Sequence, residues 1–399
     1  MANAKKVLFL HHGGGQGGGA VSLLDLIRHV DPARYQPIVA CSFTRPHARD
    51  YLSRYGIQPI DLPIAEFAHM TKTWALQSPR GIAKLLQWMA FSQPAAVRAL
   101  DSALGELQPD LVHFNGLSLL PLAPTVARRG IPVVQHVREP VNPGTFGLRR
   151  RWLEHTAANH ASHVIFICSY YRRLFRVAGN TNSIVYDPVN FDQFRHLDNL
   201  VYRAKINISH RDIVLFFPGG SSLDIKGIKP FLQALSLLRT SHREVCALVP
   251  GLDTVPHPRD TFRKEIERLI STEHLEDNLR RVPFLNEVEQ YYAASDVVVA
   301  PFTVPHFSRA VIEGGGMRLP VVGSRMDPIS EVLVDGVTGL LARPGDAKDL
   351  ARKIEILIDN PQRARAMGDA GYVRARELFD AKKHGRYVMD IYDRVLKGR

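Results

Sequence analysis

The chain has 399 residues, of which 45% are hydrophobic and 23% are charged, and its formal net charge at pH 7 is +12. This length exceeds the ~250–300 residues at which a single hydrophobic core stops growing, so we expect two domains, and the composition excludes a disordered or low-complexity protein. The three cysteines are too few and too far apart for a disulfide framework or a cysteine metal cluster, and no window approaches the ~18–20 apolar residues of a membrane span, so we expect a soluble, cytoplasmic protein.

The first predicted element is a strand at 7–10. Two lysines and a short apolar run open the chain, but glycines follow at once where a secretory signal needs a longer apolar stretch. Runs that are apolar on both faces continue at 37–43, 111–115, 132–137 and 163–168, and a second series stands at 212–219, 244–251, 296–302 and 320–324. Helical patterns separate these runs, for instance at 228–239. Repeated strand–helix units predict two doubly wound parallel sheets in tandem.

The stretch 186–199 is rich in Asp, Asn and Pro and has neither strand nor helix period, so we interpret it as the hinge. We therefore assign residues 1–190 to the first domain and 191–375 to the second. We expect the helical segment 376–399 to pack back on the first domain.

The glycine-rich segment HHGGGQGGGA lies between the first strand and an amphipathic helix. Gly17, Gly18 and Gly19 would let the backbone approach a ligand at a helix N-terminus, which attracts anions. The segment is not a dinucleotide fingerprint, because no acidic residue follows at the spacing that nicotinamide ribose binding requires. A flexible loop without a ligand is the alternative.

A second glycine segment follows the strand at 212–219. It contains Gly219, Gly220 and Ser221 and then Lys226 at a helix start, where a lysine is well placed to hold a diphosphate. Taken alone, such a lysine is more often a solvated surface residue.

The third segment is SDVVVAPFTVPHFSRAVIEGGG, in which Phe307, Ser308 and Arg309 stand where a helix should begin. Glu313 follows Arg309 by one helical turn, so both side chains can face the same site. A surface Arg–Glu helix pair is the alternative.

In their order, these pieces resemble the retaining glycosyltransferases of family 4. The resemblance covers essentially the whole chain, through the first glycine loop, PDLVHFNG, IPVVQH, VIFICS, the PGG to KG segment, SDVVVAPF, VIEGGG and DGVTGLL. It implies the GT-B fold, an α/β architecture of two Rossmann-like doubly wound parallel-sheet domains facing across a cleft. It also implies that the second domain binds the nucleotide sugar and that the first presents the acceptor.

By this resemblance, Glu313 binds the ribose hydroxyls and Lys226 holds the donor diphosphate. The family's first motif glutamate is replaced by Pro305, with His306 beside it, and its arginine partner of Lys226 is replaced by Gly220. We expect Arg309 to supply the missing cation, because a guanidinium can grip phosphate with two hydrogen bonds.

The resemblance places His136 near the anomeric centre, with Arg138 and Glu139 on the same loop, and a buried structural histidine is the alternative. Phe284 and Leu285 stand at the expected base-contact loop. The catalytic candidates are thus His136, Lys226 and Arg309.

We expect no metal site and no cofactor, because no two aspartates stand two positions apart as in the DxD site of the other large glycosyltransferase fold. The expected co-substrate is a nucleotide sugar, for which UDP is the favoured nucleotide, and the expected acceptor is a glycan or a lipid-linked glycan in polysaccharide or glycoconjugate synthesis. The alternatives are a sugar-nucleotide epimerase of the same fold and a degenerate, non-catalytic sugar-nucleotide-binding module.

The first half of the chain is the basic half, because residues 1–190 hold 20 Lys and Arg against 11 Asp and Glu. Such an excess attracts phosphates, and we expect peripheral contact with an anionic membrane at its inner face. The amphipathic segment 81–90 is a candidate to assist this contact, and an ordinary core helix is the favoured alternative for that segment. We expect no nucleic-acid partner, since nucleic-acid binding would explain the charge but not the glycine loops. Solubility alone is the alternative explanation of the charge.

Overall fold

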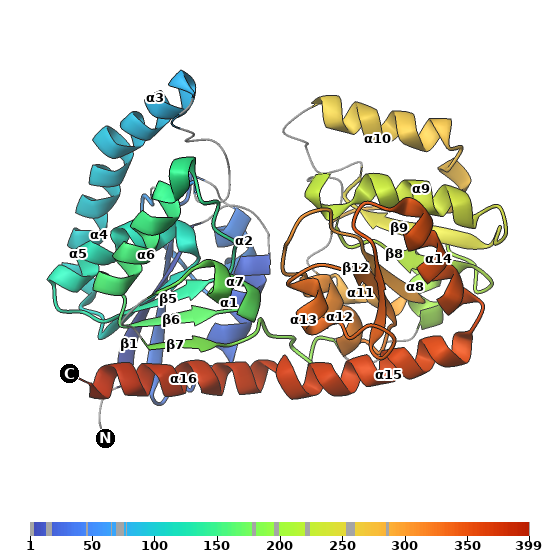
Figure 1. The fold of residues 1–399 in the computed structure, drawn as a ribbon. Helices are drawn as coiled ribbons and strands as arrows, with labels where there is room; N and C mark the ends of the chain where they lie inside the picture. The colour runs from blue at the N-terminus through green and yellow to red at the C-terminus, as the bar shows by residue number, and fades with distance from the viewer. Residues whose placement is uncertain are drawn as a thin grey trace. The chain divides into compact units, whose positions relative to one another are not determined.

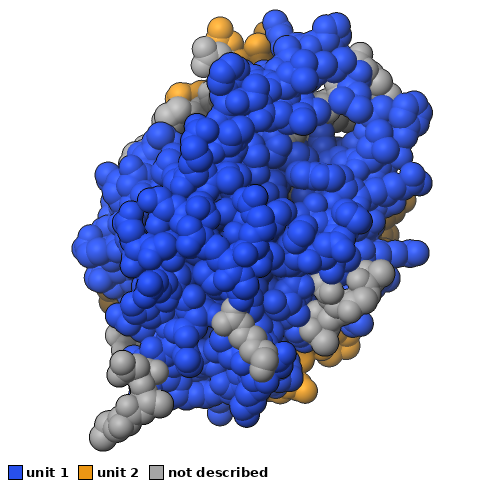
Figure 2. All heavy atoms as spheres, turned by 90° about the vertical axis from the view of Figure 1, so that its left-hand side faces the viewer, with its two compact units in different colours: residues 1–188, 381–399 blue, residues 189–380 orange. Residues whose placement is uncertain are grey.

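The structure is a computed structural model that describes residues 4–12, 18–44, 47–64, 66–68, 76, 78–177, 181–194, 199–219, 224–252, 260–284 and 287–398. The chain divides into two compact units, the first of residues 1–188 with 381–399 and the second of residues 189–380. Figure 1 labels elements of each unit, and Figure 2 colours the atoms of the first unit blue and those of the second orange.

The first unit is built on a seven-stranded sheet with strand order β3-β2-β1-β4-β5-β6-β7 (Figure 1). All of its paired strands run parallel. The strands are β1 (Lys5–His11), β2 (Tyr35–Cys41), β3 (Ile60–Asp61), β4 (Leu111–Asn115), β5 (Val133–Val137), β6 (His163–Phe166) and β7 (Thr181–Ile184). The helices are α1 (Gly18–Arg28), α2 (His47–Arg54), α3 (Pro79–Gln87), the π-helical η1 (Trp88–Ser92), α4 (Gln93–Leu107), η2 (Leu117–Leu122), α5 (Ala123–Arg128), η3 (Thr145–Gly147), α6 (Leu148–His160), α7 (Ser169–Leu174) and α16 (Ala381–Lys397).

The second unit contains a six-stranded sheet with strand order β10-β9-β8-β11-β12-β13, also parallel throughout. Its strands are β8 (Ile213–Phe216), β9 (Val245–Pro250), β10 (Leu279–Val282), β11 (Val297–Ala300), β12 (Val321–Ser324) and β13 (Gly339–Ala342). Its helices are α8 (Asn199–Lys205), η4 (Asp224–Lys226), α9 (Ile228–Leu238), α10 (Asp260–Thr272), η5 (Glu276–Asn278), α11 (Glu289–Ala293), α12 (Arg309–Gly316), α13 (Ile329–Val332), α14 (Ala347–Ile358) and α15 (Pro361–Leu378).

Apolar strands buried on both faces hold each unit together. In the first unit, Phe9 of β1 packs in one core with Leu23 of α1 and Tyr392 of α16, so the last helix belongs to this core. In the second unit, Val299 of β11 packs in a core with Phe231 of α9. The predicted fold class, two doubly wound parallel-sheet domains, is confirmed.

The glycines of the VIEGGG segment serve helix packing inside the second unit. A Cβ on Gly315 of α12 would lie 3.0 Å from the carbonyl oxygen of Gly371 in α15, and a Cβ on Gly368 would lie 2.0 Å from the carbonyl oxygen of Arg318. Larger residues would push α15 away from α12 and the turn that follows it. These glycines therefore fix the position of the helix that carries Glu313.

The end of the chain forms two helices, α15 and α16, which are separated by residues 379–380. Asn360 caps α15, and its side chain accepts from the backbone N–H of Arg363. The helix ends at Leu378, and α16 begins at Ala381, where the chain re-enters the first unit. Among the helices that the structure describes, none has the length and hydropathy that a membrane span requires.

Candidate functional site

The order in which strands are added to the second sheet reverses between β8 and β11. From β8 the chain continues to β9 on one side, whereas β11 to β13 extend the sheet on the other side. Connections that leave two neighbouring parallel strands in opposite directions open a crevice at the carboxyl ends of the strands, and ligands of open α/β sheets bind there. The predicted residues Gly219 and Lys226 follow β8, and the segment from His306 to Arg309 follows β11, so both segments lie at this switch point.

The loops after β8 and β11 touch through a glycine. Gly227 has φ +80°, and a Cβ on it would lie 1.8 Å from the carbonyl oxygen of Pro301. The backbone N–H of Thr303 also donates to the carbonyl oxygen of Ile225 at 3.0 Å. A Cβ on Gly219 would lie 2.6 Å from the ring of Phe217 and 3.2 Å from Cβ of Lys226. Only glycine permits these close approaches, which hold Lys226 at the switch point.

Lys226 is half-buried at the end of η4. Burial lowers the pKa of its ammonium group below the usual value. Across the ranges that the structure describes, no hydrogen bond or ion pair engages this group. A cation that is partly desolvated and has no protein counter-ion is suited to hold an anionic ligand.

His306 and Ser308 lie between β11 and α12. The His306 ring stacks on Phe302 with centroids 5.3 Å apart, and burial, with a contribution from the charge of Lys226, lowers its pKa to about 4. Ser308 is 2% exposed, and its Oγ has no hydrogen-bond partner among the described residues. A buried hydroxyl without a partner at a helix N-terminus marks a place where an anion would find donors. The predicted Phe307 is buried beside it.

Arg309 and Glu313 form an ion pair within α12. Arg309 Nε donates to Glu313 Oε1 at 2.9 Å, and the hydroxyl of Tyr292 donates to Glu313 Oε2 at 2.8 Å. Both members of the pair are largely buried, with side-chain exposures of 11% and 9%. The pair is therefore not the exposed surface pair that we considered as the alternative. Tyr292 was missed in the sequence, because it reads there as an apolar helix residue 21 positions away.

Four predicted site residues, Gly17, Gly220, Ser221 and Leu285, lie outside the described residues. Phe284 follows β10 and is 44% exposed, so its ring is available to a ligand. Its role in base contact stays a prediction.

The first unit has its own switch point, between β1 and β4. Asn115 ends β4, and its Nδ2 donates to Nδ1 of His11 at 2.9 Å and to the carbonyl oxygen of Gly19 at 3.0 Å. This side chain ties the start of α1, which contains the predicted Gly18 and Gly19, to the ends of two strands. Nothing in the segment PDLVHFNG distinguished Asn115 from the other residues of the predicted strand 111–115.

Arg138 lies at the centre of this polar cluster and is only 5% exposed. Its guanidinium donates to Asn115 Oδ1 at 2.6 Å, to His136 Nδ1 at 3.2 Å and to the carboxylate of Asp187. Three protein acceptors thus hold Arg138, and its predicted substrate contact stays a prediction. Glu139 is half-buried and accepts from the backbone N–H of Leu117 at 3.3 Å.

His136 is fully buried in β5 and stacks on His384 of α16, with centroids 6.0 Å apart. Burial, assisted by the charge of Arg138, holds the pKa of His136 well below its usual value. Because Nδ1 accepts from Arg138, the proton of the neutral ring is on Nε2, and the described residues offer that atom no partner. Such a donor is completed by water or by a ligand. The catalytic assignment of His136 stays a prediction.

We expect the first unit to lose stability as the pH falls from about 6.5 to about 4. The pKa of His163 is lowered to about 4, mainly by burial, and those of His11, His113 and His136 lie well below their usual value. Since these rings bind protons more readily in the unfolded chain, each lower pH in this window favours unfolding. For His163 alone the shift corresponds to about 3 kcal/mol at the acid end.

Urea unfolding at a series of pH values checks this expectation. His163→Asn should flatten part of the slope, whereas His155→Asn, at an exposed position, should leave it unchanged. An unfolding free energy that stays constant across the window would contradict the prediction.

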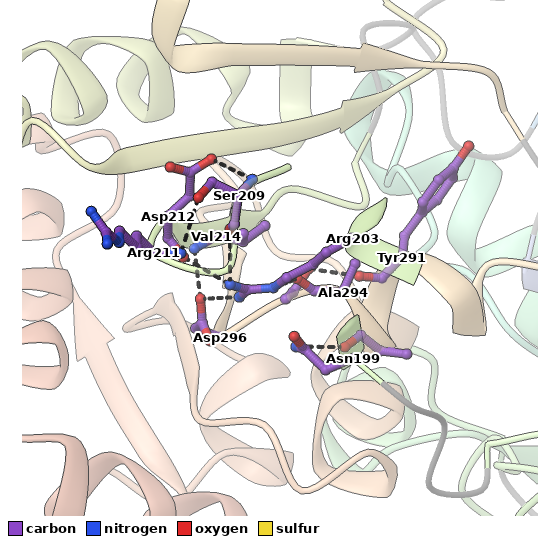
Figure 3. A network of polar contacts seen from close by, with 11 residues as sticks. Asn199, Arg203, Ser209, Arg211, Asp212, Val214, Tyr291, Ala294 and Asp296 are labelled. Carbon is purple, nitrogen blue, oxygen red and sulfur yellow. Dashed lines mark hydrogen bonds and ion pairs between the residues drawn. The ribbon is translucent and has the colours of Figure 1, made fainter. Parts of the chain in front are cut away.

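A second polar network, partly exposed at Asp296, lies at the opposite, amino ends of β8 and β11 (Figure 3). Arg203 of α8 donates to Asp296 Oδ2 at 2.6 Å and to the carbonyl oxygens of Ala294 and Asp212 at 3.0 and 2.9 Å. Asp296 in turn accepts from the backbone N–H of Val214 at 2.7 Å. Arg203 thus joins α8 to the segments that precede β8 and β11, and Asp296 joins the segment before β11 to Val214 of β8, so we interpret this network as structural.

Comparison with known proteins identifies the family of both units. A family model described as glycosyl transferases group 1 matches residues 198–374, and one described as glycosyl transferase 4-like domain matches residues 17–185. The chain is 24% identical over 344 residues to MMP alpha-(1->4)-mannosyltransferase of Mycolicibacterium hassiacum, and this alignment covers 78% of each chain. It is 28% identical over 176 residues to D-inositol 3-phosphate glycosyltransferase of Arthrobacter, covering 44% of this chain and 41% of that one.

The chain spans about half the length of several curated relatives that it matches. Among solved structures, HepE of Anabaena, in complex with UDP and glucose, superposes with a TM-score of 0.80 at 20% sequence identity. That superposition covers 98% of this chain and 99% of HepE, and it establishes the shared fold.

Proposed function

The chain belongs to the glycosyltransferases of the GT-B fold, and we propose that it transfers a sugar from a nucleotide diphosphate to a glycan or a lipid-linked glycan. A glycosyl transferase 4-like domain comes first in the chain, and a glycosyl transferases group 1 domain follows it. The second unit binds the nucleotide sugar, the first binds the acceptor, and the anomeric configuration is retained. UDP is the proposed nucleotide, in keeping with the UDP bound to HepE.

The observation that carries this proposal is the switch point of the second unit. There Lys226 lies beside the loop that leads through Ser308 into α12, and neither the Lys226 ammonium group nor the Ser308 hydroxyl has a hydrogen-bond partner among the described residues. Lys226 and the N–H groups of that helix start would hold the diphosphate, and Glu313 would accept hydrogen bonds from the ribose diol. Each carboxylate oxygen of Glu313 has one protein donor and keeps a lone pair for a ribose hydroxyl.

The chemistry asked of these residues is electrostatic. When the bond between the anomeric carbon and the diphosphate oxygen breaks, the leaving UDP gains negative charge. A fixed ammonium group and fixed N–H donors stabilise that charge without reorganising, which is worth ~3–4 kcal/mol for one well-placed donor.

Calorimetry with UDP tests the donor assignment. The parent chain should bind UDP, and Glu313→Ala should weaken binding of UDP and of the UDP-sugar alike, by about 100-fold, because the ribose is common to both and loses two charge-assisted hydrogen bonds. Tyr292→Phe removes one hydrogen bond to Glu313 and should have a smaller effect. Equal UDP affinity in Glu313→Ala and parent would remove the ribose assignment.

Release of UDP from the donor sugar separates sugar transfer from the alternatives. A transferase should release UDP faster when acceptor is present, an epimerase should give the same turnover with or without acceptor, and a degenerate binding module should release none. Acceptor-independent epimerisation would overturn the proposal.

We propose further that transfer needs no metal, with Lys226 and the α12 start in the place of a cation. Turnover should therefore be unchanged by EDTA. Among the described residues, one group has the arrangement of potential metal ligands, His242 with Glu355 and Asp359. His242 lies before the amino end of β9, whereas Lys226 follows the carboxyl end of β8. Loss of activity in EDTA that magnesium or manganese restores would contradict the prediction.

A further inference from the structure

Large apolar side chains are exposed together at one end of the first unit. On α3 and η1 these are Leu86, Met89 and Phe91, and on η3 and α6 they are Phe146, Leu148 and Trp152. Their exposures run from 42% for Trp152 to 85% for Phe146. We call these six residues the apolar face. Isolated exposed apolar residues need no explanation, but a group of this size usually marks a contact surface.

The two segments of the apolar face share one support. Phe67 packs against Trp88 of η1 at 5.4 Å and against Trp152 of α6 at 5.0 Å between ring centroids. The backbone N–H of Leu76, ahead of α3, donates to Thr145 Oγ1 of η3 at 3.3 Å. The six side chains therefore belong to one surface rather than to two unrelated places.

The backbone at Phe146 is held in an uncommon conformation. Phe146 has φ +52°, in the left-handed region that bulky residues avoid, and it stands between Gly144 at φ +72° and Gly147 at φ +75°. A strained residue that presents its ring to solvent gains nothing from packing within its own chain. The ring would gain free energy where an external apolar phase covers it.

The charge around the apolar face selects the kind of partner. The sequence contains no Asp or Glu at 67–100 or at 140–153, the two stretches that build the face. Arg80 and Lys84 are exposed on α3, and Arg151 is exposed on α6. A second copy of this chain would bring the same positive charge and be repelled, whereas an anionic surface would be attracted.

We propose that the apolar face docks on an anionic lipid bilayer. Aromatic and aliphatic side chains beside Lys and Arg match the boundary between acyl chains and phosphate headgroups. Leu86, Met89 and Phe146 enter that boundary, and Arg80 and Lys84 pair with lipid phosphates. The face lies in the first unit and uses none of the donor-site residues, so this inference stands or fails separately from the donor assignment.

Sedimentation of the full chain with vesicles tests the proposal. Binding should be strong to vesicles of phosphatidylcholine with about one third phosphatidylglycerol, weak to phosphatidylcholine alone, and reduced by added salt. The triple variant Leu86→Ser, Met89→Ser, Phe91→Ser should bind at least about tenfold more weakly. Val373→Ser, which changes a 65% exposed residue on α15, is the matched control and should bind like the parent.

Two further variants separate docking from folding and from charge alone. Phe146→Gly removes the ring and relaxes the left-handed backbone, so it should weaken vesicle binding while its unfolding temperature stays the same or rises. Arg80→Gln with Lys84→Gln should lower the preference for anionic vesicles, whereas Arg363→Gln with Arg365→Gln, exposed on α15, should not.

UDP affinity measured by calorimetry should be unchanged in every one of these variants. Equal vesicle binding by the triple variant and Val373→Ser would overturn the proposal. So would self-association in analytical ultracentrifugation that the triple variant abolishes, since the face would then be a contact between copies of the chain.

Discussion

Lys226→Met should abolish most sugar transfer while leaving the second unit as stable as the parent or more stable. The ammonium group has no protein counter-ion among the described residues, and burial lowers its pKa. The folded chain therefore bears an uncompensated desolvation cost at pH 7, which a methionine of similar length removes. The same charge faces the leaving diphosphate, so its loss should lower kcat by about 10²–10³-fold.

Lys229→Met provides the matched control. Lys229 stands one turn further along, at the start of α9, but it is already paired with Glu265 at 2.7 Å, and this pair raises its pKa. Its removal should leave kcat close to that of the parent. Thermal unfolding and turnover on one donor and acceptor pair measure both effects. A Lys226→Met enzyme with near-parent kcat, or one that is clearly less stable, would contradict the role assigned to this lysine.

This opposition of stability and activity is typical of a binding group held ready without its ligand. Gly219 and Gly227 show how the chain maintains this arrangement, since a Cβ on Gly227 would collide with the carbonyl oxygen of Pro301 and a Cβ on Gly219 with the ring of Phe217. The fold thus holds Lys226 between two strand ends rather than against a carboxylate. UDP, by supplying the missing negative charge, should stabilise the second unit more in the parent than in Lys226→Met.

The strands that could be predicted from the sequence were those with continuous apolar runs. Such runs at β1, β8 and β11 report burial on both faces, which is a local property of the sequence. The four strands that escaped prediction have other patterns. β3 has two residues, β7 reads TNSI, β10 contains two arginines in LRRV, and β13 begins with glycine in GLLA. At β10 and β13, which form the two edges of the second sheet, neighbours distant in sequence decide the pairing.

The residues of the candidate site were also predictable only where a local segment of the sequence marks them. Lys226 and Glu313 stand in recognisable segments after strands, and the topology brings those segments to one edge of the sheet. Tyr292, which holds the second oxygen of Glu313, lies on a different helix and belongs to no motif. Asp187 and His384 in the first unit are likewise brought to Arg138 and His136 only by the fold. Residues that contact a site residue from a distant part of the sequence depend on tertiary packing, which a single sequence does not display.

Arg309→Ala should lower kcat by more than it weakens UDP-sugar binding, by about tenfold or more in kcat. Arg309 stands at the first position of α12, and the family arginine that would join Lys226 is replaced by Gly220. A second cation beside Lys226 would act most strongly as the leaving diphosphate gains charge. Installing arginine at position 220 in the Arg309→Ala background should recover part of the loss.

The structure adds a competing explanation, because Arg309 Nε already donates to Glu313 at 2.9 Å. If Arg309 only positions Glu313, its removal acts on the ribose contact, and uridine, which has the ribose but no phosphate, should lose as much affinity as UDP. If the guanidinium contacts the diphosphate, UDP should lose affinity and uridine should lose much less.

The outer Nη atoms extend beyond the Nε that binds Glu313, so one planar guanidinium has the donors to serve both groups. We therefore expect the loss for UDP to exceed the loss for uridine by at least about tenfold. Glu313→Ala provides the opposite reference, since it should weaken uridine and UDP equally. Equal losses in Arg309→Ala as well would make Arg309 a positioning residue and leave the diphosphate to Lys226 and the N–H groups that open α12.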